Sequence, residues 1–466
     1  MRPEEARQSV GATTSTCGIC GRLLPARILA RGGGVYFFKW CPEHGPQEDL
    51  VCSDPDYHAR TAKYHRAGAM PLAFSEGHGK PCPEACGLCA DHEQHVCMPV
   101  IEITDHCDLA CPVCLVVNNG SRHLSPAQVG AILDELARTE GQIDVVNLSG
   151  GEPTLNPDFR EIVDLCLARR EILRVSVSTN GLVLLEDEGL LRFLAERDVV
   201  ISLQFDGLGE GASRTLRGRA LASLKLRLLE KARALDAPVS LTVTVAAGVN
   251  EEAPAQAAAL LFANDHILSV TVQPAAYPGG EGKLARPPRP TTIPDVIGAL
   301  DGCAGGRIRA SDFCPLPCSH PACFSLAFYL KVEDGAFLPV NGLVEADQYL
   351  CMIQNRGLLG TDAESFRRIQ DAVYELWSGP AALAPDSQKA LGAVRQLLAS
   401  ATSCGGYAPG RAFSAAERSI KSIFIHQFMD RHTFDLSRVR KCCTVYPQPD
   451  GRLVPACVRN CLESPR

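Results

Sequence analysis

Six short runs of apolar and β-branched residues recur along the middle of the chain and predict buried strands. Each run is rich in Val, Ile, Leu and Thr, as are parallel strands that are covered on both faces. Longer stretches with helical periodicity separate the runs, so strands and helices alternate. The six predicted strands span residues 100–104, 145–149, 174–178, 199–205, 239–245 and 269–273.

Five helices are predicted between these strands. The first begins at Ser125-Pro126, a serine N-cap followed by proline at the first helical position. This alternation predicts an α/β fold with right-handed crossovers, and six parallel strands make an open partial (β/α)6 barrel, short of the closed eight-stranded form. The other four helices are expected over residues 158–169, 187–197, 221–235 and 253–264.

Cysteine-rich regions without clear periodicity flank the predicted barrel on both sides. We expect a metal ribbon over residues 1–60, an auxiliary-cluster segment over 61–98, the barrel over 99–276 and a C-terminal auxiliary-cluster domain over 295–466. A stretch rich in Pro and Gly at residues 277–294 is typical of a linker, here between the barrel and the C-terminal domain.

Composition and charge narrow the class of protein. The chain of 466 residues is 46% hydrophobic and 21% charged, as in ordinary globular proteins. Its net charge of -7 gives no indication of nucleic-acid binding. Neither a secretory signal nor an apolar run long enough to cross a bilayer is found, so we expect a cytoplasmic location, with a peripheral place at the membrane left open.

The cysteine content changes the picture, because 22 cysteines fall mostly into short clusters. A reducing cytoplasm disfavours disulfides, so clusters of this kind indicate metal. Isolated cysteines such as Cys166 and Cys351 suit the simpler role of a small buried hydrophobic residue.

Cys107, Cys111 and Cys114 follow the first predicted strand with the spacing C-x3-C-x2-C. Three thiolates can hold three irons of a 4Fe–4S cluster and leave the fourth iron open for a ligand. The amino and carboxylate groups of S-adenosylmethionine (SAM) would chelate that iron. The spacing alone also fits structural zinc or an electron-transfer cluster.

A second motif, Ser149-Gly150-Gly151-Glu152-Pro153, stands at the end of the second predicted strand. Carboxyl ends of parallel strands meet at one edge of a sheet, where α/β proteins bind ligands. Paired glycines allow close approach of the backbone, and a glutamate can accept from an ammonium group.

Together these motifs resemble the radical SAM superfamily. The resemblance implies that Gly150, Gly151 and Glu152 hold the methionyl amino group of SAM. It also implies that the ends of the next two strands contact the SAM carboxylate and ribose, although Asn-Gly after the third strand also suits a simple turn. Val113 stands where many members place an aromatic residue against adenine. The expected contacts with the carboxylate and ribose are Ser178, Asn180 and Gln204.

Three further groups of metal ligands are predicted. Cys82, Cys86, Cys89 and Cys97 offer four thiolates for an auxiliary 4Fe–4S cluster, with zinc as the alternative. The spacing of the N-terminal group is that of a ribbon holding Zn or a single Fe, and Cys52 competes with His44 for the fourth place. The ribbon ligands are expected to be Cys17, Cys20, Cys41 and His44, and those of a C-terminal cluster Cys318, Cys323, one of Cys442 and Cys443, and Cys457.

Over almost its whole length the chain resembles a narrower family that includes archaeal tetraether synthase. The resemblance rests on C-x3-C-G-L-C-x2-H-x2-H-x-C from Cys82, on P-C-S-H-P-x-C from Pro317, and on P-D-G-R-L-x-P-x-C ending at Cys457. It implies a 5′-deoxyadenosyl radical that attacks an unactivated C–H bond, and coupling of lipid hydrocarbon tails. An electron donor such as ferredoxin or flavodoxin is implied as a partner.

Two other functions remain open from the sequence. One is radical SAM methylation or coupling of a small polar substrate, such as a heterocycle or peptide, since members of this family have been suggested as pterin methylases. The other is an iron–sulfur electron carrier. A long apolar tunnel near Glu152 is required by lipid coupling, whereas a polar pocket above Cys107 favours the small substrate.

Overall fold

The computed structural model describes residues 8–74, 82–83, 86–115, 119–277, 283–332, 335–343, 345–355, 388–394 and 417–463. Its central element is a curved sheet in which six consecutive parallel strands hold the core. These are the six strands predicted from the sequence, so the partial α/β barrel is confirmed. They are β5 (Met98–His106), β7 (Ile143–Gly150), β8 (Ile172–Thr179), β9 (Val200–Gln204), β10 (Val239–Val245) and β11 (Ile267–Pro274).

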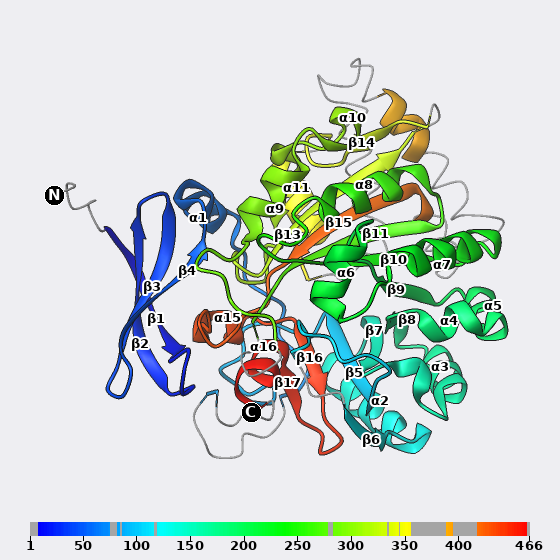
Figure 1. The fold of residues 1–466 in the computed structure, drawn as a ribbon, viewed down its shortest axis with the longest axis horizontal. Helices are drawn as coiled ribbons and strands as arrows, with labels where there is room; N and C mark the ends of the chain where they lie inside the picture. Colours follow the sequence, from blue (N-terminus) through cyan, green and yellow to red (C-terminus); the bar gives the residue numbers. More distant parts are fainter. Residues whose placement is uncertain are drawn as a thin grey trace.

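The predicted helices are all present and lie along the outer side of the strands (Figure 1). Ser125 caps the first of them, as the sequence led us to expect, and it also forms a capping box with Gln128. Three shorter elements that were not predicted stand at strand ends: η2 (Pro153–Leu155), α4 (Leu182–Glu186) and α6 (Glu210–Arg217). The predicted helices are α2 (Pro126–Glu140), α3 (Phe159–Leu167), α5 (Glu188–Glu196), α7 (Ala222–Ala234) and α8 (Ala253–Ala263).

Strands from the C-terminal region extend the barrel at both edges. β15 (Ile420–His426) pairs in parallel with β11, and β16 (Thr444–Pro447) pairs in parallel with β5. β13 (Phe324–Lys331) runs antiparallel to β15 and carries that edge further. The smaller strands are β6 (Asn119–His123), β12 (Cys314–Pro315), β14 (Phe337–Pro339) and β17 (Leu453–Pro455).

The N-terminal region forms a separate four-stranded antiparallel sheet, drawn in blue at the left of Figure 1. Its strands are β1 (Gln8–Thr16), β2 (Leu23–Arg31), β3 (Gly34–Cys41) and β4 (Gly45–Cys52), and the antiparallel pair β2 and β3 lies between the two pairs of ribbon ligands. A buried lysine attaches this sheet to the C-terminal region. Lys39 forms an ion pair with Asp49 at 3.2 Å and donates to the carbonyl oxygen of His432 at 2.6 Å.

The described part of the predicted linker lies across the cysteine loop that follows β5. The backbone N–H of Leu284 donates to the carbonyl oxygen of Pro112 at 2.9 Å, and Lys283 Nζ donates to that of Cys114 at 3.1 Å. This segment is therefore a strap over the loop as well as a connection between regions.

Helices of the flanking regions are short. None of the helices within the described ranges is long and apolar enough to cross a membrane. They are α1 (Pro55–Thr61), η1 (Ala62–Tyr64), α9 (Ile293–Leu300), α10 (Cys303–Gly306), η3 (Ala310–Asp312), α11 (Ala346–Ile353), α15 (Leu436–Arg440), α16 (Ala456–Val458) and η5 (Arg459–Glu463).

Candidate radical SAM site

The loop with Cys107, Cys111 and Cys114 leaves the carboxyl end of β5, and all three thiols are half-buried. Burial raises the pKa of Cys107 to about 12, and the nearby carboxylates of Asp108 and Glu152 add to this. Burial also raises the pKa of Cys111, against the influence of Arg217. Iron binds thiolates, so loading a cluster here would release protons from the loop.

The two glycines at the end of β7, Gly150 and Gly151, have no room for a side chain. A Cβ atom on Gly150 would lie 2.1 Å from the carbonyl oxygen of Thr104, and one on Gly151 would lie 2.1 Å from that of His106. Gly150 also has φ of +128°, which side chains of L residues disfavour. The backbone N–H groups of Gly151 and Glu152 each donate at 2.8 Å to these same two carbonyls. The glycine turn is thus joined to the strand that leads into Cys107.

Glu152 is only 1% exposed, and its carboxylate binds groups from two strand ends. Oε1 accepts from the hydroxyls of Thr154 and Thr179, both at 2.7 Å, and Oε2 accepts from the backbone N–H of Asn180 at 2.8 Å. Burial raises its pKa, while these hydrogen bonds oppose the shift. The carboxylate therefore holds the ends of β7 and β8 together, and its contact with the SAM amino group stays a prediction.

The three residues expected to contact the SAM carboxylate and ribose have different surroundings. Ser178 shares hydrogen bonds with Asn147 at 2.9 and 3.1 Å and lines the central cavity. Gln204 also lines the cavity and donates to Asp206. Asn180 instead donates to Oδ1 of Asp108 at 2.6 Å, between the first and second cysteines of the loop. Asn180 is thus placed to position the loop.

Arg217 on α6 was not identified from the sequence. Its guanidinium donates to both carboxylate oxygens of Asp206, at 2.7 and 2.9 Å, and to the Thr244 hydroxyl at 2.9 Å. Burial opposes its charge, but Asp206 and Cys111 outweigh burial and raise the pKa of Arg217. The side chain lines the cavity beside Cys111. One arginine on a short helix carries no distinguishing sequence signal, so only the fold reveals it.

A cavity of about 490 Å³ lies inside the barrel and reaches Cys114, Gly150 and Arg217. Alternate residues along each barrel strand point into it, as the pleat of a strand requires. Most of these inward side chains are polar. The polar residues from the six strands are Glu102, Asn147, Ser149, Arg174, Ser176, Ser178, Ser202, Gln204, Ser240, Thr242, Thr244, Ser269, Thr271 and Gln273.

The cavity wall formed by β13, β15 and the residues that follow β15 is aromatic. The ring of His426 stacks on Phe324, with ring centroids 3.9 Å apart, and packs against Phe428 at 4.0 Å. Burial, with a smaller effect of Arg438, lowers the pKa of His426 to about 3, so this ring is neutral at physiological pH. One wall of the cavity therefore offers hydrogen-bonding groups and another offers flat rings.

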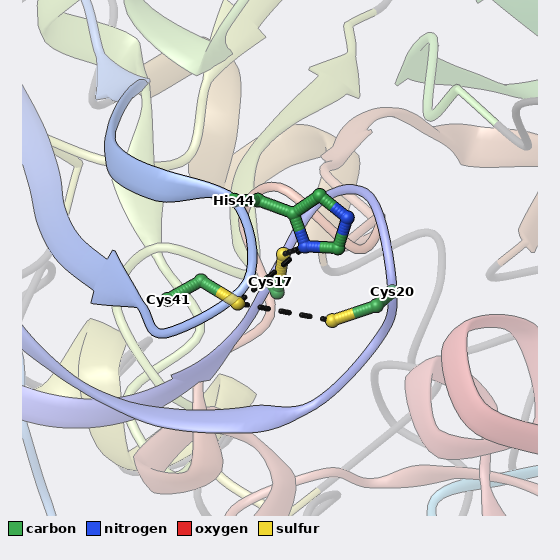
Figure 2. A group of neighbouring side chains, drawn as sticks. All are labelled: Cys17, Cys20, Cys41 and His44. Atoms are coloured by element: carbon green, nitrogen blue, oxygen red, sulfur yellow. Dashed lines mark hydrogen bonds between the residues drawn. The ribbon is translucent and has the colours of Figure 1, made fainter.

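The ribbon residues Cys17, Cys20, Cys41 and His44 come together at one end of the N-terminal sheet (Figure 2). Their ligand atoms all lie within 4.8 Å of one another, and no other set within the described ranges meets that criterion. His44 Nδ1 lies 3.5 Å from Cys41 Sγ and 3.6 Å from Cys17 Sγ. Cys52 is not in the set, because its thiol donates to the carbonyl oxygen of Asp54 at 3.2 Å. His44 is thus the fourth ligand candidate.

The remaining cysteines group differently from the arrangement expected from their spacing. Cys86 lies beside Cys82, with Cys89 and Cys442 close enough to influence its charge. Cys97 lies instead beside Cys318 and Cys443, and these two contacts, together with burial, raise its pKa.

The cysteines expected to hold the C-terminal cluster also fall into two separate groups. Arg438 Nε donates to Cys323 Sγ at 3.3 Å, and Cys457 lies near the same guanidinium. Spacing could not show this division, because each group joins segments that are far apart in the chain.

Two segments match known families. Residues 101–261 match the family described as Radical SAM superfamily. The barrel of this enzyme is a radical SAM domain. Residues 9–53 match the family described as HMPTM N-terminal zinc ribbon domain, so the enzyme has an N-terminal zinc ribbon, in agreement with the four-ligand site of Figure 2.

Named relatives of this radical SAM enzyme differ in how much of it they match. It is 26% identical over 488 residues to 7,8-dihydro-6-hydroxymethylpterin dimethyltransferase of Methanocaldococcus jannaschii, with 97% of this chain and 93% of the relative covered. It is 38% identical over 149 residues to mycofactocin maturase MftC of Mycobacterium ulcerans, which covers 31% of this chain and 39% of the maturase. Among solved structures, SuiB of Streptococcus suis has a TM-score of 0.38 at 16% identity, covering 44% of this chain and 45% of SuiB.

Proposed function

We propose that this radical SAM enzyme modifies a small reduced heterocycle of the pterin class, with C-methylation as the reaction. Cys107, Cys111 and Cys114 would hold the 4Fe–4S cluster. With SAM bound, the cluster supplies a 5′-deoxyadenosyl radical that takes a hydrogen atom from the substrate. The resulting carbon radical would take up one electron from an auxiliary cluster and accept the methyl group of a second SAM molecule, which would leave as S-adenosylhomocysteine.

The polar interior of the barrel is the observation that carries this proposal. Hydroxyl and amide side chains such as Asn147, Ser202 and Thr242 point into the cavity from successive strands. These groups bond one another, as Asn147 does with Ser178 and Ser202 with Thr242 at 3.0 Å, and they keep further donor and acceptor capacity that a hydrocarbon tail would leave unused. A heterocycle with nitrogen and oxygen on its edges would give them partners.

The aromatic wall supports the same class of substrate. The stacked rings of Phe324, His426 and Phe428 offer a flat surface to a planar ring. Such ring pairs contribute about 0.5–1.5 kcal/mol beyond the burial of area. A cavity of about 490 Å³ also falls within the usual range of small-molecule sites. The relative from Methanocaldococcus jannaschii, matched over nearly the whole chain, is named for a dihydropterin substrate.

The side chains at the cluster end would orient SAM. Arg217 presents a buried positive charge beside Cys111, which suits the methionyl carboxylate. Ser178 and Gln204 line the same part of the cavity and can exchange hydrogen bonds with the ribose hydroxyls. Val113 is buried with Tyr277 in one apolar cluster, which would cover the adenine ring in place of a neighbouring aromatic residue.

The separate cysteine groups would hold two auxiliary 4Fe–4S clusters, and the ribbon would hold one Zn or Fe ion. Cys97 and Cys443 line the substrate cavity on the side away from the radical loop, so a cluster there could exchange electrons with a substrate radical. An external donor such as ferredoxin or flavodoxin would reduce the catalytic cluster.

The test is an anaerobic reaction of reconstituted enzyme with SAM, dithionite and 6-hydroxymethyl-7,8-dihydropterin. We expect 5′-deoxyadenosine and a pterin heavier by one methylene unit, with deuterium passing from labelled pterin to 5′-deoxyadenosine. Coupling of lipid tails stays a prediction from the sequence and is tested in parallel with a membrane-lipid extract. Loss of hydrogen from the lipid with no change in the pterin would overturn our proposal in favour of lipid coupling.

A further inference from the structure

A group of hydrogen-bond acceptors without donors lies on one side of the substrate cavity. Two buried oxygen atoms there have no hydrogen-bond partner among the described residues: Thr444 Oγ1 on β16 and Asn460 Oδ1 on η5. Thr444 is 2% exposed, so water does not supply the missing partner from bulk solvent. The amide oxygen of Asn460 can only accept and the hydroxyl of Thr444 can accept as well as donate, so a ligand that brings donors would satisfy both atoms.

Glu102 adds a carboxylate to this group. It points inward from β5, next to Ser149 in the register of β5 and β7, and lines the cavity with Thr444 and Asn460. Its Oε2 accepts from Arg459 Nη2 at 3.4 Å, whereas no described residue donates to Oε1. Tyr446, which also lines the cavity, feels the charge of Glu102 and bonds Asn460, so Glu102 and Asn460 lie at one site, and Thr444, two residues before Tyr446 on β16, lines the same cavity.

Glu417 also lines the cavity, but its carboxylate is already paired with an arginine. Glu417 pairs with Arg174 at 2.7 Å, and Arg174 also bonds Asp198. Burial raises the pKa of Glu417 to about 7, so near neutral pH this side chain is partly protonated. Glu102 is therefore the lining carboxylate that keeps an accepting oxygen for a ligand.

We infer that Glu102, with Thr444 and Asn460, recognises the 2-amino-4-oxopyrimidine edge of the substrate. That edge presents two neighbouring N–H donors, from the ring nitrogen and the exocyclic amine, and a carboxylate accepts such a pair side by side. The remaining amine hydrogen would go to Asn460 or Thr444. The inference rests on the proposed function for its substrate, a pterin, but guanine carries the same edge.

The test compares ligands that differ only at this edge. The KM of reconstituted wild-type enzyme is measured for 6-hydroxymethyl-7,8-dihydropterin and for its analogue with oxygen in place of the 2-amino group. Charge-assisted hydrogen bonds lead us to expect a KM about 10- to 100-fold lower for the amino form. E102Q offers one acceptor and one donor to the edge in place of two acceptors, so we expect it to lose this preference. Glu135→Gln, on the outer helix α2, is the matched control and should keep it.

A second variant and a second ligand separate failure of this inference from failure of the proposed function. If E102Q does not fold, Thr444→Val keeps the shape of the side chain, removes one acceptor and should raise the KM of the amino form alone. Equal KM values for both pterins in the wild type overturn this inference and leave pterin modification standing. Modification of guanosine, with no action on either pterin, supports the edge recognition and overturns the pterin proposal. No action on any ring overturns both.

Discussion

Asn180 Nδ2 donates to Asp108 Oδ1 at 2.6 Å, so the end of β8 holds the cysteine loop that follows β5. This hydrogen bond joins the third strand of the barrel to the segment between Cys107 and Cys111. Hydrogen bonds to charged groups contribute about 1.5–3 kcal/mol. We therefore expect Asn180→Asp, which brings two carboxylates together, to lower the iron content and to slow 5′-deoxyadenosine formation.

The exchanged pair Asp108→Asn with Asn180→Asp is the control, because it restores one donor and one carboxylate. Iron per chain after reconstitution is the readout. Equal iron content in Asn180→Asp and wild type would show that the loop does not depend on this bond.

Removing one cluster ligand should stop the radical chemistry. Cys111→Ala leaves two thiolates for the catalytic cluster, and we expect no 5′-deoxyadenosine after reduction with SAM present. Cys351→Ser is the matched control, since Cys351 is an exposed cysteine on α11 away from the loop. Formation of 5′-deoxyadenosine by Cys111→Ala at the wild-type rate would remove this residue from the catalytic set.

The glycine turn after β7 should tolerate no side chain. Gly150→Ala combines a clash with the Thr104 carbonyl and an unfavourable φ, so we expect a loss of about 3 kcal/mol in the free energy of unfolding. Gly211→Ala on α6 has open space around the new Cβ and should stabilise the protein by about 0.5–1 kcal/mol. Denaturant titration measures both, and similar midpoints for the two variants would contradict the tight packing of the turn.

The ribbon metal should depend on Cys17 and not on Cys52. Cys17→Ala removes one of four ligands, and we expect the loss of one zinc or iron ion per chain and a lower melting temperature. Burial raises the pKa of Cys52 to about 11, so it stays a thiol, and Cys52→Ser should keep the ion. Elemental analysis measures the ion content of both variants, and loss of the ion from Cys52→Ser would show that Cys52 is a ligand after all.

His426 should make the protein sensitive to acid. Its folded pKa of about 3 lies below the ordinary value near 6.5, so the unfolded chain binds the proton more tightly. The full free energy of unfolding is therefore present above pH about 6.5. As the pH falls from there towards about 3, protonation of His426 in the unfolded chain lowers it by about 1.4 kcal/mol per pH unit. Chemical denaturation at pH about 7.5 and about 5.5 should show a smaller difference for His426→Phe than for the wild type. Parallel losses in both proteins would exclude this histidine as the cause.

The barrel could be predicted because its strands are buried on both faces and alternate with helices along the chain. The strands that extend the barrel at its two edges could not be predicted. β16 is a four-residue strand, Thr444–Pro447, and it pairs with β5 from the other end of the sequence. Such a strand carries little periodicity, and nothing local specifies a partner so far away.

The candidate site was predictable to a similar degree. Short motifs located Cys107 and Gly150, because their chemistry lies within a few residues. The spacing of Cys82, Cys86, Cys89 and Cys97 indicated one group, yet the fold carries Cys97 away to Cys318 and Cys443. Arg217 and Glu102 could not be identified from the sequence, because only the folded barrel shows that their side chains line the cavity.

The pairing of β15 with β11 and of β16 with β5 also has a consequence for how the enzyme is made. Both edges of the parallel barrel are completed by strands that are synthesised long after β5 and β11. A nascent chain that has already synthesised Cys107, Cys111 and Cys114 still has two open sheet edges. Iron delivered before β15 and β16 are made would therefore meet an unfinished barrel, so we expect cluster insertion to follow the synthesis of these two strands.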